Sequence, residues 1–453
     1  MEGATRTGRL AIAADAWRTK LWPLPTACVL VSVIAGVGLP QLDRAIDAGL
    51  SELVSAWLFS GGPEAARSVL SAIAGSLITV TSLTFSLTVV TLQLASSQFS
   101  PRLLRTFARD HVVQGTLGLF LATFAFSLTV LRTVRSATSQ GPGFVPQIST
   151  TVAVVLALLS VLALVFFLGH LARQIRIETV LETVRRETEE TIAETVPDAG
   201  DQPAPLPPWV EEVGRGQRIA ADSSGFLVAV NGGKLLEAAV DLDAVVLVDR
   251  RPGDPVVAGV PLAFALPLED DGALDVVGLA KRVRAAVTVG AERTAPQDLA
   301  FGVRQLVDVA AKALSPGIND PTTAVHALTH LSSLMCRLGN RPLVDDRLCD
   351  EEGRVRVVLR RYSYADLLEL AVAQTRRYGA SEPAVLERLL ILLREVAWCT
   401  DGEDRRRCVR EQLERTRQVV VDGEFDDVDR TRLLGTSRDV EVALAGDWPP
   451  SGT

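Results

Sequence analysis

Four long runs of uncharged, mostly apolar residues constrain this chain more than any other feature of its sequence. They cover residues 21–39, 69–95, 112–131 and 150–171, and none contains Asp, Glu, Lys or Arg. A helix needs about 20 such residues to cross the hydrocarbon core of a bilayer. Residues 1–172 are therefore predicted to form a transmembrane domain of about four helices, and the lipid bilayer is the first partner that the sequence implies.

The short loops between these runs predict the orientation of the chain. Basic residues cluster before the first run, between the second and third, and after the fourth, at Arg6, Arg9, Arg18, Lys20, Arg102, Arg105, Arg109, Arg173 and Arg176. The other loops contain Arg44, Arg67, Arg132 and Arg135. By the positive-inside rule, both termini are expected in the cytoplasm, in a multi-pass protein of the plasma (inner) membrane. A cleaved signal peptide is the alternative for the first run, although no A-x-A cleavage site follows it.

The second run is unusually rich in hydroxyl side chains. At about 100° per residue, its small and polar residues fall into two stripes on nearly opposite faces of one helix. The threonine stripe consists of Thr81, Thr84, Thr88 and Thr91. The glycine-serine stripe consists of Gly75, Thr79, Ser82, Ser86 and Gln93.

Two interpretations of these stripes stay open. Small residues let helix backbones approach closely, and a Ser or Thr hydroxyl can bond the carbonyl four residues earlier, so both stripes could serve helix packing. Alternatively, one stripe packs while the other lines a conduit, where neutral hydroxyls avoid burying charge at the bilayer midplane. The threonine stripe is the predicted pore lining. The glycine-serine stripe is the predicted packing surface or alternative pore face.

A basic face follows the second run directly. Ser100 and Pro101 are typical of a helix N-cap and first helical position. Arg102, Arg105 and Arg109 then recur on one side of the expected helix. Such a face near the membrane is expected to bind lipid headgroups. The alternative is a ring of positive charge at the inner mouth of a conduit, which would favour anions.

The rest of the chain is charged and divides into three predicted parts. Residues 173–214 are expected to extend the fourth helix and to end in a Pro-rich linker. Residues 215–290 contain short β-rich runs separated by Gly, Asp and Pro, which predict a small β-barrel or sandwich module, with a strand pair around a tight turn at 251–262. Residues 291–453 are expected to be mainly helical, with helices at 299–314, from 321 onward, and at 364–378, 382–398 and 403–421, and a strand at 355–359. The predicted fold class is an α-helical integral membrane protein with a cytoplasmic α+β region.

The sequence lacks a convergent set of catalytic residues. A net charge of −8 without an isolated basic block argues against nucleic-acid binding. The five widely spaced cysteines are predicted to be free thiols in a reducing compartment. Neither a P-loop nor a G-x-S-x-G motif occurs, so we expect no enzyme activity and no cofactor.

Two polar groups are candidate ligand sites. His326 and His330 have the i, i+4 spacing of metal ligands, but two ligands do not make a site and no third histidine is near, so no metal site is predicted. A second group joins two expected helices and consists of Ser315, Asn319, Asp320, Thr322 and Thr323. It is expected to be a capped turn, with Gly317 supplying a positive φ and Asp320 the N-cap. A bound ion or anion is the alternative.

Two long segments resemble a known family. They are residues 92–110, LQLASSQFSPRLLRTFARD, and residues 298–328, DLAFGVRQLVDVAAKALSPGINDPTTAVHAL. Both are similar to the bacterial predicted-membrane-protein family catalogued as domain of unknown function 2254, and the resemblance extends over nearly the whole chain. It implies a multi-span inner-membrane protein and no assigned activity.

The leading functional hypothesis is a homo-oligomeric conduit for ions or small solutes, with the second span lining the path and the cytoplasmic region gating or assembling it. The absence of charge from the middle of the spans favours passive flow, or no flow at all, over coupled transport. The alternative is a non-conducting, membrane-anchored sensor or scaffold whose soluble region binds a ligand or a partner. An enzyme comes third.

Overall fold

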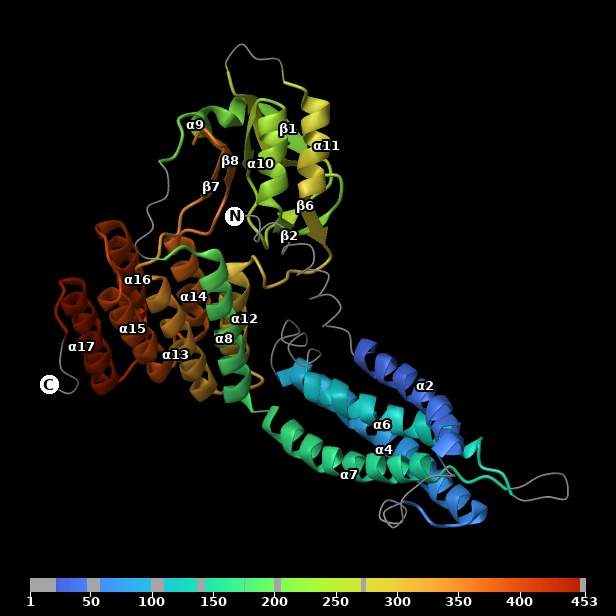
Figure 1. Ribbon diagram of the computed structural model, residues 1–453. Helices are drawn as coiled ribbons and strands as arrows, with labels where there is room; N and C mark the ends of the chain where they lie inside the picture. Colours follow the sequence, from blue (N-terminus) through green and yellow to red (C-terminus); the bar gives the residue numbers. More distant parts are fainter. Residues whose placement is uncertain are drawn as a thin grey trace. The chain divides into compact units, whose positions relative to one another are not determined.

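The computed structural model describes residues 22–46, 58–98, 110–136, 143–174, 176–198, 205–269 and 274–448 of the 453-residue chain. These residues form two compact units that divide between Arg176 and Ile177. We call them the membrane unit and the C-terminal unit, and each is described by itself (Figure 1).

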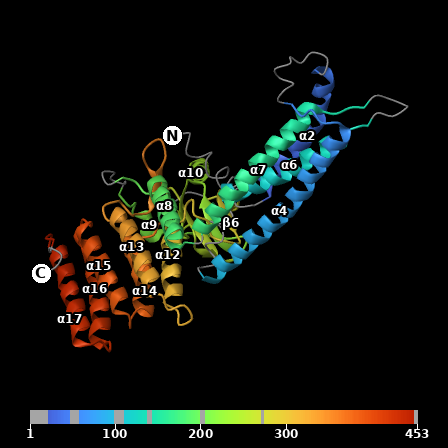
Figure 2. The same ribbon diagram turned by 90° about the horizontal axis from the view of Figure 1, so that it is seen from below.

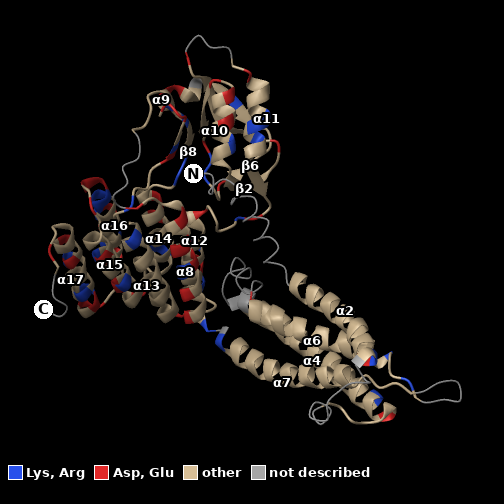
Figure 3. Ribbon diagram, viewed as in Figure 1, with Lys and Arg blue, Asp and Glu red and all other residues tan. Residues whose placement is uncertain are grey.

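The described part of the membrane unit contains four helices: α2 (Pro23–Ile46), α4 (Pro63–Gln98), α6 (His111–Leu131) and α7 (Gln147–Gln174). All four are long and apolar enough to span a membrane, as predicted. They run alongside one another in Figures 1 and 2, and their ribbons carry very few charged residues in Figure 3. Each helix is longer than the uncharged run that predicted it.

Two carboxylates fix α7 against its neighbours at its two ends. Asp43 of α2 accepts hydrogen bonds from the backbone N–H groups of Ile148 and Ser149 at 2.9 and 3.1 Å, and from the Ser149 hydroxyl at 2.6 Å. It thereby satisfies N–H groups that the first turn of α7 leaves without a helical partner. Asp110, the N-cap of α6, contacts Nε2 of His170 in the last turns of α7 at 2.7 Å.

The C-terminal unit begins with α8 (Ile177–Thr195) and contains two sheets. The larger has the strand order β1 (Gln217–Ala220), β5 (Pro261–Pro267), β3 (Ala244–Val248), β8 (Val355–Leu359) and β7 (Asp346–Cys349). Only β3 and β8 are parallel among the neighbours of this sheet. The smaller sheet is antiparallel, in the order β4 (Pro255–Val256), β2 (Gly225–Val230) and β6 (Val287–Gly290).

The central strand β3 is buried along its whole length. Val246 and Val248 share a core with α10 (Gly232–Asp241) and α11 (Val276–Ala286). On the other face, Leu247 packs with residues of α9 (Trp209–Glu212) and η2 (Val213–Arg215). Because both faces are covered, the strand is a continuous apolar run without polar alternation.

Of the small β-barrel or sandwich predicted for residues 215–290, the described part of the chain shows no closed barrel, and two helices, α10 and α11, alternate with the strands. Residues 251–262 are not a strand pair, since β4 pairs with β2 whereas β5 pairs with β1 and β3. Strands β7 and β8 join the larger sheet from beyond residue 290.

Six further described helices form one array with α8, in which α12 and α13 lie against α8 and α17 lies at the far end (Figures 1 and 2): α12 (Leu299–Ala313), α13 (Pro321–Leu338), α14 (Tyr364–Tyr378), α15 (Pro383–Trp398), α16 (Glu403–Asp422) and α17 (Asp427–Leu444). The first five match predicted helices closely, and the predicted strand at 355–359 is β8. Helix α17 was not predicted.

Candidate functional site

The threonine stripe is buried inside the membrane unit. Its four side chains, those of Thr81, Thr84, Thr88 and Thr91, are between 2% and 8% exposed. The hydroxyls of three of them donate to carbonyl oxygens four residues earlier in α4, at 2.6 to 2.9 Å. Such bonds are typical of threonine in a packed helix. The pore-lining role stays a prediction, and a single membrane unit leaves this face little exposed surface with which to line a path.

The glycine-serine stripe is exposed. All five of its residues, Gly75, Thr79, Ser82, Ser86 and Gln93, lie on the surface of the described membrane unit. A Cβ atom added at Gly75 would meet no described atom within 4 Å. One stripe therefore packs within the unit and the other faces outward. The basic face of Arg102, Arg105 and Arg109 lies outside the described residues.

The polar segment between α12 and α13 contains the predicted N-cap. Oδ1 of Asp320 accepts a hydrogen bond from the Thr323 backbone N–H at 3.1 Å, and Oδ2 accepts one from the Thr323 hydroxyl at 2.6 Å. The Thr323 hydroxyl, which bonds the ionised form, lowers the pKa of Asp320. Asp320 is thus engaged in starting α13.

The other residues of this segment form an exposed turn. The Ser315 hydroxyl donates to the Lys312 carbonyl at 2.6 Å, and the side chains of Asn319 and Thr322 are exposed. The positive φ of the turn, 49°, is at Asn319 and not at Gly317, where it was predicted. Asn tolerates this backbone region because its short side chain can bond locally.

The two histidines of α13 pair with α8. Nδ1 of His326 lies 3.5 Å from Glu178, and Nδ1 of His330 lies 3.8 Å from Glu182. Burial lowers the pKa of His330. These contacts join α13 to α8 along one face.

A cavity of about 510 Å³ opens where β3 and β8 end. Its lining includes the start of α10, the residues that follow the two parallel strands, and Leu348 of β7. In α/β proteins, ligands bind beyond the carboxyl ends of parallel strands. The volume lies within the range of about 300 to 1,000 Å³ that is typical of small-molecule sites.

Three arginines dominate the polar lining of this cavity. Arg250 follows β3, and Arg360 and Arg361 directly follow β8. Asp346 is the one acidic residue among the described lining, so the lining has a net formal charge of +2 in a chain whose net charge is −8. The lining residues are therefore net basic, and Asp249 and Asp345, which pair with two of the arginines, lie outside the lining.

Each of these arginines already contacts a carboxylate. Arg250 Nη1 lies 3.2 Å from Asp249, Arg360 Nη1 lies 2.8 Å from Asp345, and Arg361 Nε donates to Asp346 at 2.8 Å. A guanidinium carries five N–H donors, so each keeps donors beyond these bonds. The pairs hold the guanidinium groups in place without using all of their hydrogen-bonding capacity.

The loop that carries Arg250 is held by a tight turn. Asp254 N–H donates to the Arg251 carbonyl and the Asp254 carboxylate accepts from the Arg251 N–H, both at 2.9 Å. Gly253 has a φ of 94°, and a Cβ atom there would lie 2.2 Å from Oδ2 of Asp298. Only glycine fits such a position, since both the backbone angle and the close approach exclude a side chain.

The ion pair of Asp298 with Arg293, at the start of α12, lies against this turn. Asp298 is 2% exposed and receives two hydrogen bonds from Arg293, at 2.7 and 2.9 Å. Burial raises the pKa of Asp298, and the hydrogen bonds from Arg293 oppose that rise. The Tyr362 hydroxyl donates to Asp254 at 3.2 Å, and burial together with the Asp254 charge raises the pKa of Tyr362 to about 12.

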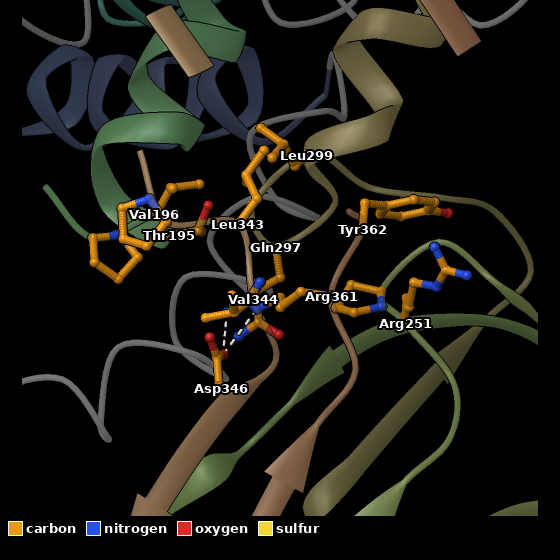
Figure 4. A pocket seen from close by; sticks show the side chains of 13 residues that line it. Thr195, Val196, Arg251, Gln297, Leu299, Leu343, Val344, Asp346, Arg361 and Tyr362 are labelled. Atoms are coloured by element: carbon orange, nitrogen blue, oxygen red, sulfur yellow. Dashed lines mark hydrogen bonds and ion pairs between the residues drawn. The ribbon is translucent and has the colours of Figure 1, made fainter. Parts of the chain in front are cut away.

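A narrow crevice adjoins the cavity (Figure 4). The two share Pro252, Gln297, Asp346 and Arg361. At about 20 Å³ the crevice has room for about one water molecule. Thr195 and Val196, at the end of α8, form part of its wall, and the hydrogen bonds of Arg361 to Asp346 are drawn within it. Arg361 therefore borders both the cavity and the end of α8.

The arginines of the cavity were not predicted from the sequence. The sequence contains a pattern that could have indicated them, because Arg250-Arg251 and Arg360-Arg361 each follow an apolar strand. The two dipeptides are about 110 residues apart, and only the parallel pairing of β3 with β8 brings them together.

Comparison with known proteins shows the family. The model of a family described as "Predicted membrane protein (DUF2254)" matches residues 18–395, which include the four membrane-unit helices and all three cavity arginines. Uncharacterised proteins of Mycobacterium tuberculosis and Mycobacterium bovis are each 36% identical over 419 residues, which cover 92% of this chain and 79% of the relative. No solved structure shows significant similarity. The chain belongs to the DUF2254 family of predicted membrane proteins.

Proposed function

We propose that the protein is a membrane-anchored sensor. The C-terminal unit binds a small ligand in the 510 Å³ cavity, and the membrane unit anchors it in the inner membrane with both termini in the cytoplasm. The proposal includes no catalytic activity. The observation that carries the proposal is the cavity, whose lining combines apolar residues with three arginines, as small-molecule sites do.

The position of Arg361 supports transmission of a conformational change from the ligand to α8, the helix that follows the membrane unit. Arg361 borders both the cavity and the crevice that α8 closes. Arg341 donates to the Val196 carbonyl at 2.9 Å and so holds the end of α8 beside the crevice. Only residues 175 and 176 separate α8 from α7 in the chain. A ligand that repositions Arg361 would change the packing at the C-terminal end of α8, and this 19-residue helix would have to carry the change to its N-terminal end, which follows the candidate span α7.

The test is a fragment screen on the full-length protein in phosphatidylcholine nanodiscs. Saturation-transfer NMR is run with neutral, cationic and anionic fragments on the wild type, on Leu236→Trp and on Val277→Trp. Leu236 lines the cavity, whereas Val277 is 82% exposed on α11 and does not line it. We expect fragments that bind the wild type and Val277→Trp but not Leu236→Trp, and that slow amide hydrogen exchange in α8. If no fragment of any class is lost in Leu236→Trp, the cavity is not a ligand site.

A homo-oligomeric conduit is the second candidate, and the exposed glycine-serine stripe favours it. Small and hydroxyl residues on the outside of a spanning helix suit either packing against a second copy or contact with water. Single cysteines at Thr79, Ser82 and Ser86, in a background that lacks the native five, would then react with a water-soluble thiol reagent. Cysteines at the buried positions Thr84 and Thr88 serve as controls and should stay unreacted. Silence at all five positions would exclude a water-filled path along α4.

A further inference from the structure

We infer that the ligand of the cavity is a phosphorylated small molecule. Its phosphate group contacts Arg250, Arg360 and Arg361, and its apolar part packs against Leu236, Leu348 and Leu359. This inference rests on the proposed function, because it takes the cavity as the ligand site and adds the chemical class of the ligand.

The lining of the cavity favours an anion over a cation. Three arginines and one aspartate line it, whereas Asp249 and Asp345, which pair with Arg250 and Arg360, are not lining residues, so an anion would meet guanidinium donors with one carboxylate beside them. The side chains of Arg250, Arg360 and Arg361 are 32%, 37% and 24% exposed. Because they are partly shielded from water, their attraction for an anion is stronger than that of fully exposed arginines.

The number and type of the donors favour phosphate. Planar guanidinium groups bind phosphate oxygens through paired N–H donors, and a phosphate monoester presents three peripheral oxygens to three such groups. The first turn of α10 adds backbone N–H groups at Gly232 and Gly233, which also line the cavity. A single carboxylate would leave part of this donor set unused.

The apolar walls indicate that the phosphate carries an organic group. Leu236 of α10, Leu348 of β7 and Leu359 of β8 line the same cavity as the arginines. Inorganic phosphate would leave these side chains in contact with water, whereas an apolar group would remove their surface from it. We therefore expect an organic phosphate to bind more tightly than inorganic phosphate.

The test uses phenyl phosphate as the probe, with phenol and inorganic phosphate as comparison compounds. Binding to the full-length protein in phosphatidylcholine nanodiscs is measured by isothermal titration calorimetry. Phenyl phosphate should bind more tightly than either comparison compound. Phenol lacks the charge and inorganic phosphate lacks the ring, so the pair separates the two parts of the inference.

The variant that tests the arginines is Arg250→Gln, matched by Arg282→Gln. The side-chain hydrogen bonds of Arg250 go to its neighbour Asp249, so the loss of Arg250 should leave the fold intact. Arg282 is likewise bonded to one aspartate, Asp241, but lies on α11 away from the cavity lining. Loss of one charge-assisted hydrogen bond should weaken phenyl phosphate binding about 10-fold or more in Arg250→Gln. Arg282→Gln should match the wild type.

A change of the nanodisc lipid tests whether the phosphate belongs to a water-soluble ligand or to a lipid headgroup. If nanodiscs containing phosphatidylglycerol leave the affinity for phenyl phosphate unchanged, the natural ligand is water-soluble. If phosphatidylglycerol weakens phenyl phosphate binding to the wild type but not to Arg250→Gln, the natural ligand is a lipid headgroup. Both outcomes support phosphate chemistry. Equal binding of phenyl phosphate and phenol, or equal affinities of Arg250→Gln and wild type, would overturn it. If neutral fragments still bind the wild type but not Leu236→Trp, the cavity remains a ligand site and only the phosphate chemistry is excluded. If no fragment loses binding in Leu236→Trp, the proposed function is excluded as well.

Discussion

Asp350 stabilises the hairpin that carries two of the cavity arginines. It follows β7, and its carboxylate, 1% exposed, accepts hydrogen bonds from Nε of Arg356 at 2.7 Å and from Nε of Arg354 at 3.0 Å. Burial would raise the pKa of Asp350, but these hydrogen bonds to the ionised form hold the pKa at about 2. A buried carboxylate is thus retained because two arginines of the same hairpin need it as a partner.

Replacement of Asp350 by Asn should therefore destabilise the protein in a pH-dependent way. The pKa is about 2 in the folded protein and 3.8 for an ordinary aspartate, so the stabilisation from the charge is complete above pH 3.8 and is lost as the pH falls through about 2. The difference in melting temperature between the wild type and Asp350→Asn should shrink over that interval. Glu352→Gln, which removes an exposed partner of Arg354, is the control. A difference that stays constant with pH would show that the charge of Asp350 does not stabilise the fold.

Individual helices and strands were predicted well where the pattern is long or sharply bounded. Helix α14 and strand β8 have the predicted bounds, and the Asp320 N-cap marks the start of α13. Helix α10 was missed because it is ten residues long and lies between apolar strands, so its helical period is brief. Strand partners could not be predicted, since β3 pairs with a strand more than a hundred residues away.

The contact between α8 and α12 depends on a glycine. A Cβ atom at Gly302 of α12 would lie 1.8 Å from the Thr188 hydroxyl and 2.8 Å from the Thr188 Cβ of α8. Gly302→Ala should push the two helices apart and cost about 1 to 3 kcal/mol of stability, as overpacking does. The expected result is a lower melting temperature of the C-terminal unit and faster amide exchange in α8.

The control for this prediction is another helical glycine. A Cβ atom at Gly435 of α17 would meet no described atom within 4 Å. Gly435→Ala should therefore stabilise the protein by about 0.5 to 1 kcal/mol, because alanine loses less backbone entropy in a helix. Equal effects of the two substitutions would show that α8 and α12 do not pack through Gly302.

For the molecule as a whole, the sequence predicted the two units better than the site. Apolar runs specify spans directly, because the bilayer sets their length. Two similar polar stripes on α4 could not be told apart from spacing alone, and only the packing of α4 in the membrane unit shows that the threonine stripe is the buried one. The cavity depends on pairing between β3 and β8, which local pattern does not encode.

The orientation of the whole chain is the remaining prediction, and it rests on the distribution of basic residues. Four spans predict that both termini lie on one side, and the three basic clusters predict that this side is the cytoplasm. A green fluorescent protein fused after residue 453 should fluoresce, and alkaline phosphatase at the same position should be inactive. The same reporters inserted at Gly62, between α2 and α4, should give the reverse. Exchange of the two results would keep four spans but invert the chain and place the cavity outside the cytoplasm. Identical results at both positions would mean that an even number of crossings separates them instead of the three formed by α4, α6 and α7.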